Sequence, residues 1–133
     1  MKPAAARELR RILYVEDDEA IRTVGLVTLR AVGRFEVVAC ASGAEALAQA
    51  PSASADLILL DVMMPGMDGP ETLARLRRIP ETATTPVVFL TARVQPEAIA
   101  ELRALGAVEV LSKPFEPMGL PEILRKIWAR VPG

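Results

Sequence analysis

The stretch Leu57-Ile58-Leu59-Leu60-Asp61 is a continuous apolar run that ends in a carboxylate. Four apolar residues without polar alternation are typical of a β-strand that is buried on both faces. Such strands occur in parallel sheets that carry helices on each side. This stretch therefore indicates an α/β fold.

Four similar runs flank this stretch: Arg11–Val15, Phe35–Ala39, Pro86–Leu90 and Val108–Ser112. The first residues of the five runs lie 24, 22, 29 and 22 positions apart, which leaves room for a helix after each strand. Right-handed crossovers place such helices on both faces of the sheet. We expect a flavodoxin-like (βα)5 three-layer sandwich with a parallel five-stranded sheet in the order 2-1-3-4-5. Residues 11–131 would form this domain, after an N-terminal tail at residues 1–10.

Helical periodicity fills the intervals between the predicted strands. The last helix has one apolar stripe: Leu120, Ile123, Leu124, Ile127, Trp128 and Val131. The first helix has a weaker one: Ile21, Val24, Thr28 and Val32. Three helix starts are indicated, by a capping box of Ser42 with Glu45 and by Pro70 and Pro96. Gly33 and Gly106 indicate helix ends. Pro51–Asp56 and Pro80–Thr85 are predicted surface connections.

Composition excludes several classes of function. Of 133 residues, 16 are basic and 17 acidic, so a net charge of −1 gives no electrostatic basis for binding nucleic acid or a membrane surface. The absence of histidine excludes histidine-based catalysis, and the single Cys40 excludes an internal disulfide. Met1–Arg10 lacks the apolar run of a signal peptide, and no segment reaches the roughly 20 apolar residues of a membrane span. We expect a cytoplasmic protein.

Polar side chains follow four of the five predicted strands: Glu16-Asp17-Asp18, Asp61, Thr91 and Lys113. The carboxyl ends of parallel strands meet at one sheet edge, where α/β folds bind ligands. Each group also has a simpler interpretation, because acids favour a helix N-terminus, Asp61 and Thr91 could serve a turn or loop, and Lys113 could be an exposed lysine. Their convergence on one edge favours a shared site.

The carboxylates of Asp17 and Asp61 would repel each other at this edge unless a cation holds them together. Oxygen ligands without histidine or thiolate indicate Mg²⁺. A carboxylate can also act as a nucleophile and form an aspartyl phosphate. With the hydroxyl of Thr91 and the ammonium of Lys113 to neutralise phosphoryl oxygens, the sequence predicts a phosphoryl-acceptor site.

Four motifs resemble those of bacterial response-regulator receiver domains: Ile12-Leu-Tyr-Val-Glu-Asp-Asp18, Leu57-Ile-Leu-Leu-Asp-Val-Met-Met-Pro-Gly-Met-Asp-Gly69, Pro86-Val-Val-Phe-Leu-Thr-Ala92 and Leu111-Ser-Lys-Pro-Phe115. The resemblance covers nearly the whole chain. It implies a stand-alone, chemotaxis-regulator-like receiver that accepts a phosphoryl group from a sensor histidine kinase or a histidine phosphotransfer protein. It also implies that Asp61 is the phosphoacceptor. The implied Mg²⁺ ligands are Asp61, Asp17, Glu16 through water, and the backbone carbonyl of Met63.

The same resemblance implies that Thr91 and Lys113 each contact a phosphoryl oxygen and that the Lys113–Pro114 bond is cis. Receivers usually carry Tyr or Phe three residues before the lysine, where this chain has Val110. The switch region of Thr91 and Val110 therefore lacks the usual ring. We favour switching through the loop after Thr91 and the fourth helix. The alternative is a phosphate sink with little conformational output.

Met63 and Arg93, each two residues past a site residue, flank the path of the attacking water in this family. An apolar Met63 cannot orient that water, so we predict a slowly decaying aspartyl phosphate. Simple loop packing is the other interpretation of Met63.

Two other classes of function fit less well. A phosphohydrolase of the haloacid-dehalogenase type needs a second aspartate where this chain has Met63, and a flavodoxin-like binding protein needs a Ser/Thr/Gly-rich loop where it has Glu16-Asp17-Asp18. We expect no enzyme activity beyond self-phosphorylation and autodephosphorylation. We also expect output by contact with an unknown downstream protein, as a monomer or weak dimer. The alternative is a receiver fragment of a larger regulator.

Overall fold

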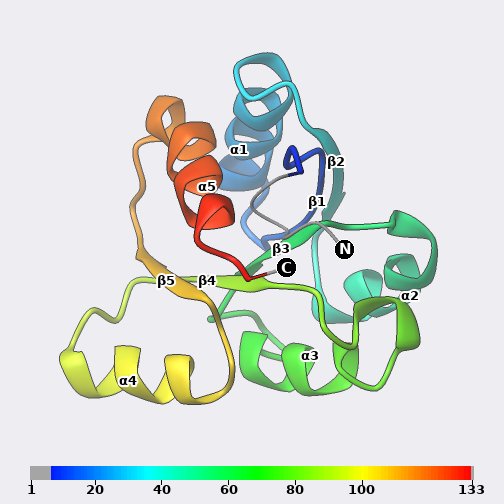
Figure 1. Cartoon of the computed structure of the whole chain (residues 1–133). Coiled ribbons are helices and arrows are strands. Elements are labelled where there is room, and N and C mark those ends of the chain that lie inside the picture. The colour runs from blue at the N-terminus through cyan, green and yellow to red at the C-terminus, as the bar shows by residue number, and fades with distance from the viewer. Residues whose placement is uncertain (1–6, 133) are drawn as a thin grey trace.

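The computed structural model describes residues 7–132 and has a five-stranded parallel sheet in the order β2-β1-β3-β4-β5 (Figure 1). The strands are β1 (Arg11–Val15), β2 (Glu36–Cys40), β3 (Leu57–Asp61), β4 (Val87–Thr91) and β5 (Glu109–Ser112). The α-helices are α1 (Glu19–Ala31), α2 (Gly43–Ala53), α3 (Gly69–Leu76), α4 (Pro96–Ala104) and α5 (Leu120–Ala129). Short 3₁₀ helices are η2 (Pro80–Thr82) and η3 (Pro117–Gly119). The expected flavodoxin-like α/β architecture and strand order are confirmed.

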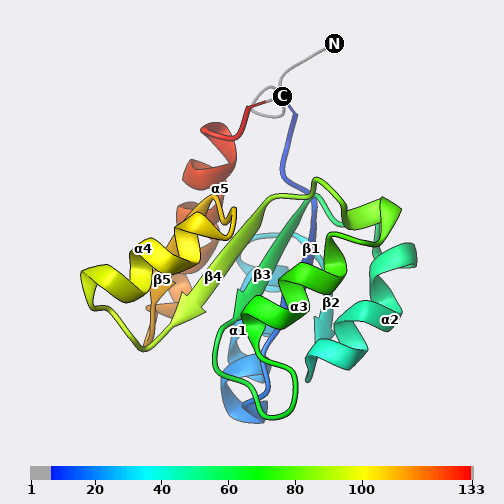
Figure 2. The same ribbon diagram turned by 90° about the horizontal axis from the view of Figure 1, so that it is seen from below.

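The sheet separates two apolar cores. Helices α1 and α5 cover one face of the sheet, and α2, α3 and α4 cover the other (Figures 1 and 2). Leu57 and Leu59 of β3 pack into the first core, whereas Ile58 and Leu60 pack into the second. All four side chains are fully buried. The run is apolar throughout because both faces of β3 are covered.

Two strands reach further than the sequence indicated. The structure places Asp61 and Thr91 inside β3 and β4 as their last residues. Asp61 pairs with Leu90, and Thr91 with Ser112, so the ladder extends to the site residues themselves. Both side chains therefore project from a rigid sheet edge.

The predicted apolar stripe of α1 is wrong in part. Val24 and Val32 are 48% and 45% exposed, and the buried residues are Gly25, Thr28 and Leu29. The helix is rotated because Tyr14 of β1 lies under Gly25: a Cβ there would come within 2.5 Å of the Tyr14 hydroxyl. In α5 the stripe is confirmed except at its second member, Ile123, which is 40% exposed.

The two predicted surface connections are also partly wrong. Helix α2 continues through Pro51 to Ala53, because Ala50 packs into the core and the proline ring lies on the exposed side. The second connection forms η2, in which Thr82 is buried and donates its hydroxyl to Leu76 O at 2.6 Å. Its backbone is tied down by the guanidinium of Arg77, which donates to two carbonyls of this segment.

The segment before β1 packs against the domain from residue 7 onward. Leu9 is buried in the core with α5, and Trp128 Nε1 donates to Arg7 O at 2.7 Å. Residues 1–6, which belong to the expected tail, lie outside the described residues. Within residues 7–132, no helix has the length and apolar character needed to cross a bilayer.

Candidate functional site

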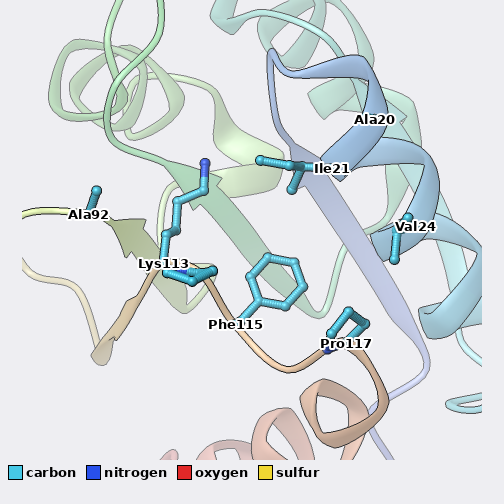
Figure 3. Close-up of a pocket in the computed structure, with 8 residues that line it drawn as sticks. Ala20, Ile21, Val24, Ala92, Lys113, Phe115 and Pro117 are labelled. Carbon is cyan, nitrogen blue, oxygen red and sulfur yellow. The ribbon is translucent and has the colours of Figure 1, made fainter.

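The polar residues that follow the strands meet at the carboxyl edge of the sheet. Backbone hydrogen bonds extend the ladders past the strand ends: Glu16 N donates to Cys40 O at 3.0 Å, and Lys113 N donates to Thr91 O at 2.8 Å. Lys113 therefore leaves β5 beside Thr91, and Glu16 leaves β1 beside the end of β2. The close-up shows the Lys113 side chain reaching toward this edge (Figure 3).

Lys113 links two buried carboxylates. Its Nζ lies 2.8 Å from Glu16 Oε1 and 3.2 Å from Asp61 Oδ1. Glu16 and Asp61 are 0% and 1% exposed, and the lysine side chain is 16% exposed. Lys113 is therefore not the exposed lysine of the simpler interpretation.

The carboxyl groups of Glu16, Asp17 and Asp61 form a compact cluster. One oxygen from each lies within 4.8 Å of the other two. Asp61 Oδ2 is buried and has no hydrogen-bond partner, and Glu16 Oε1 lacks a well-aligned hydrogen bond despite the nearby ammonium. Three carboxylates with one lysine leave negative charge uncompensated. Because carboxylate oxygens are hard ligands and one from each of the three residues lies close to the other two, the cluster fits a divalent cation.

The electrostatics of Asp61 follow from this crowding. The pKa of Asp61 is raised to about 7, chiefly by burial and then by the carboxyl groups of Asp17 and Glu16, and Lys113 offsets this rise only in part. Burial also acts to lower the pKa of Lys113, but the carboxylates of Glu16 and Asp61 outweigh it and the pKa is raised. The lysine therefore stays charged, and without a cation the cluster favours a retained proton.

The acidic run after β1 divides between two roles. Asp18 caps α1, since its Oδ1 accepts from Ile21 N at 2.9 Å, and Glu19 lies in the first turn. Glu16 and Asp17 precede the helix and belong to the carboxylate cluster. The interpretation of these acids as a helix N-terminus is therefore correct only for Asp18 and Glu19.

Thr91 is buried at the edge of the site but is held within its own loop. Its Oγ1 accepts from Arg93 N at 3.0 Å. This is the loop-capping role of the simpler interpretation, and within residues 7–132 the hydroxyl makes no hydrogen bond to the carboxylates. A phosphoryl contact by Thr91 remains a prediction.

The structure shows where three other residues of the predicted site lie, but it does not test their predicted roles. Met63 follows β3 and its side chain is 63% exposed. Val110 is half-buried in β5, pairs with Phe89 and packs on the α2–α4 side of the sheet. The Lys113–Pro114 peptide bond is cis.

Two residues that support the site were missed from the sequence. Arg22 donates from Nη1 to the carbonyls of Glu16 at 2.9 Å and Asp17 at 3.3 Å, so it fixes the backbone of the acidic loop. The signal was a basic residue in the first turns of a helix, where the dipole disfavours it. Gly69 is the second residue: a Cβ there would lie 2.5 Å from Asp61 O.

Fold and site together define a flavodoxin-like α/β domain with a buried carboxylate–lysine site at the carboxyl edge of its parallel sheet. The family model described as "Response regulator receiver domain" matches residues 12–125. The chain belongs to this family, the receiver domains of two-component response regulators.

Known relatives agree with this assignment. The chain is 40% identical over 134 residues to "Protein-glutamate methylesterase/protein-glutamine glutaminase 2" of Cereibacter sphaeroides, covering 96% of this chain and 36% of that protein. It is 37% identical to "Phosphate regulon transcriptional regulatory protein PhoB" of Rhizobium meliloti, covering 91% and 52%. The chain thus spans about half or less of these two curated relatives. The crystallised chemotaxis protein CheY4 of Vibrio cholerae superimposes with a TM-score of 0.82 at 38% identity, covering 90% of this chain and 99% of that one.

Proposed function

We propose that Asp61 is the phosphoacceptor of this receiver and that its phosphodonor is a phosphohistidine on a separate sensor histidine kinase or histidine phosphotransfer protein. The observation that carries the proposal is the free, buried Asp61 Oδ2 beside Lys113 and two further carboxylates. The 133 residues of this chain contain no histidine, so the phosphohistidine has to lie outside them. The proposed functional unit is residues 11–131.

The carboxylate cluster is the proposed Mg²⁺ site. Asp17 and Asp61 would hold the ion directly, Glu16 through water, and Met63 by its backbone carbonyl. When bound, Mg²⁺ would neutralise charge on the phosphoryl oxygens and on the cluster. A bound cation would also offset the carboxylate crowding that, together with burial, raises the pKa of Asp61, so that Asp61 would be ionised and nucleophilic.

In the transfer step, one Asp61 carboxylate oxygen forms a bond to phosphorus while the phosphorus–nitrogen bond of the donor breaks. The donor imidazole keeps the electron pair and takes up a proton. The Lys113 ammonium, already 3.2 Å from Asp61 Oδ1, would pair with a phosphoryl oxygen. Thr91 would contact another after its hydroxyl releases Arg93 N.

An apolar groove beside the site supports docking of the donor there. It has a volume of about 560 Å³ and lies between α1 and the segment after β5 (Figure 3). Its lining is Ala20, Ile21, Val24, Ala92, Lys113, Pro114, Phe115 and Pro117. Lys113 at its inner end connects the groove to Asp61, so a helix laid in it would bring a phosphohistidine close to the acceptor.

The proposed output is protein–protein contact in the cytoplasm, with an unknown downstream protein and no catalysis beyond the domain's own phosphorylation and dephosphorylation. A monomer or weak dimer, without direct contact to nucleic acid, fits the near-neutral charge. The alternatives are a phosphate sink and the receiver part of a larger regulator.

Incubation with acetyl phosphate and Mg²⁺, followed by intact-protein mass spectrometry, tests the proposal. We expect a mass gain of one phosphoryl group that requires Mg²⁺ and is lost in Asp61→Asn. An equal gain in Asp61→Asn would contradict it.

Phosphotransfer from a panel of purified, phosphorylated kinases tests the donor and its docking site. We expect transfer from a small subset of the panel and slower transfer to Ile21→Ser, with the rate from acetyl phosphate unchanged. Thr23→Ser, an exposed change on the same helix, is the matched control. Equal rates for both variants would exclude the groove as the docking site.

A further inference from the structure

A second concave surface lies at the amino edge of the sheet, opposite Asp61. This basic groove, of about 980 Å³, carries five arginines: Arg7, Arg10, Arg11, Arg34 and Arg125. They come from the segment before β1, from β1, from the α1–β2 turn and from α5. All five residues are exposed. None belongs to the phosphoacceptor site.

The groove holds more positive charge than its own acids balance. Its three acidic residues are already engaged: Glu36 pairs with Arg11 at 2.7 Å, Asp56 with Arg7 at 3.9 Å, and Glu8 with Arg10 at 3.7 Å. Asp56 Oδ2 also accepts from the backbone N–H groups of Arg10 and Arg11. Five arginines against three carboxylates leave a net charge of +2 in a protein whose total charge is −1.

The excess charge is located on two side chains. Arg34 and Arg125 pair with no carboxylate among residues 7–132, and residues 1–6 carry no acidic side chain. Arg125 donates to Gly33 O and stacks over the Phe35 ring at 4.5 Å, which holds its guanidinium in place beside the turn that carries Arg34. A fixed guanidinium is well suited to bind a carboxylate through two hydrogen bonds.

Trp128, which lines the groove, and Phe35, which lies under Arg125 beside it, favour a protein ligand over a nucleotide or nucleic acid. Trp128 and Phe35 are each only 4% exposed, and guanidinium groups of Arg7 and Arg125 lie over their rings. No free aromatic face of these two residues remains to stack a base. The arginines are also spread over several elements, which suits a chain of separated charges.

From these observations we propose that the basic groove is a docking site for an acidic segment of a partner protein, with at least two carboxylates that pair with Arg34 and Arg125. This surface is independent of phosphorylation at Asp61 and adds to the proposed function.

Titration of ¹⁵N-labelled protein with octaglutamate, followed by NMR, tests the inference at low ionic strength. The indole N–H of Trp128, the only tryptophan, gives one well-separated reporter signal in the groove. We expect saturable shifts of this signal and of groove amides. Octaglutamine should give none, and raising the ionic strength from about 0.02 M to about 0.3 M should abolish the shifts.

Three variants locate the binding. We expect Arg34→Gln and Arg125→Gln each to weaken octaglutamate binding by at least about threefold. Arg78→Gln removes the same charge from an exposed position outside the groove and should change nothing. The Arg34 side chain makes no hydrogen bond or ion pair with residues 7–132, so Arg34→Gln keeps the test valid if Arg125→Gln is unstable. Asp61→Asn should bind like the wild type, which separates this inference from the proposed phosphoacceptor.

Several results would overturn the proposal. They are the absence of saturable shifts, equal weakening by Arg78→Gln, and tighter groove binding of tripolyphosphate or octadeoxythymidylate than of octaglutamate.

Discussion

At the scale of single residues, Asp61 has two opposing effects. Its burial beside Glu16 and Asp17 prepares a cation site, but without the cation it destabilises the folded chain. The folded-state pKa of about 7 is above the ordinary value of 3.8, so the folded protein binds the Asp61 proton more tightly than the unfolded chain. At pH values below the ordinary pKa of 3.8, this proton contributes its full stabilisation of the folded state. The stabilisation is lost as the pH rises through the folded-state pKa of about 7.

We therefore predict that Asp61→Asn stabilises the metal-free protein, by roughly 1 to 3 kcal/mol at pH 8 and much less at pH 4. Urea unfolding in EDTA at both pH values measures the difference. Saturating Mg²⁺ should stabilise the wild type more than the variant, because it binds the folded carboxylates. A variant less stable than the wild type at pH 8 in EDTA would contradict this account of the site.

The second prediction at the scale of single residues concerns Met63 and the lifetime of the aspartyl phosphate. Its exposed thioether cannot orient a water molecule for attack on an aspartyl phosphate. We expect the phosphorylated protein to persist far longer than seconds without a phosphatase and Met63→Asn to shorten its lifetime several-fold. Loss of the phosphoryl mass with time measures the rate. Decay of the wild type within seconds would contradict the prediction.

At the scale of elements, the contact between α1 and β1 is tight. An alanine normally stabilises an exposed helix position relative to glycine. At Gly25 the added Cβ would instead clash with Tyr14, whose hydroxyl, Cε2 and Cζ lie within 2.8 Å of its position. We expect Gly25→Ala to lower the free energy of unfolding by about 1–3 kcal/mol. Val27→Ala, at a 59% exposed position of the same helix, is the control and should change it little. Equal stability of the Gly25→Ala protein and the wild type in chemical denaturation would show that the helix shifts freely.

The elements also show what the sequence could and could not predict. The α/β class and the polar sheet edge followed from apolar runs such as Leu57–Leu60 and from the residues after them, whereas the strand order came with the expected flavodoxin-like fold. The rotation of α1 did not follow, because it depends on Tyr14 in another element rather than on the helix's own periodicity. Helix α2 passes Pro51 for a similar reason: packing of Ala50 outweighs the local signal of the proline. In the site, Arg22 was missed because its acceptors are backbone carbonyls, which a side-chain pattern does not reveal.

At the scale of the whole molecule, the question is whether phosphorylation changes the surface. Thr91 starts from a hydrogen bond to Arg93 N in the loop between β4 and α4, and Val110 packs against the core that includes Leu102 of α4. Movement of Thr91 toward a phosphoryl group breaks this bond and frees the loop after β4. We expect NMR shifts on adding beryllofluoride and Mg²⁺ to extend from this loop into α4 and β5, without ring movement at position 110. Shifts confined to the carboxylate cluster would favour the phosphate sink instead.

The central claim is that one aspartate among five receives the phosphoryl group. Reduction of the acetyl phosphate-treated protein with borohydride converts an aspartyl phosphate to homoserine, which peptide mass spectrometry then locates. The account predicts homoserine at position 61 alone, and only when Mg²⁺ was present during phosphorylation. Homoserine at position 17, 18, 56 or 68 in place of 61 would contradict it.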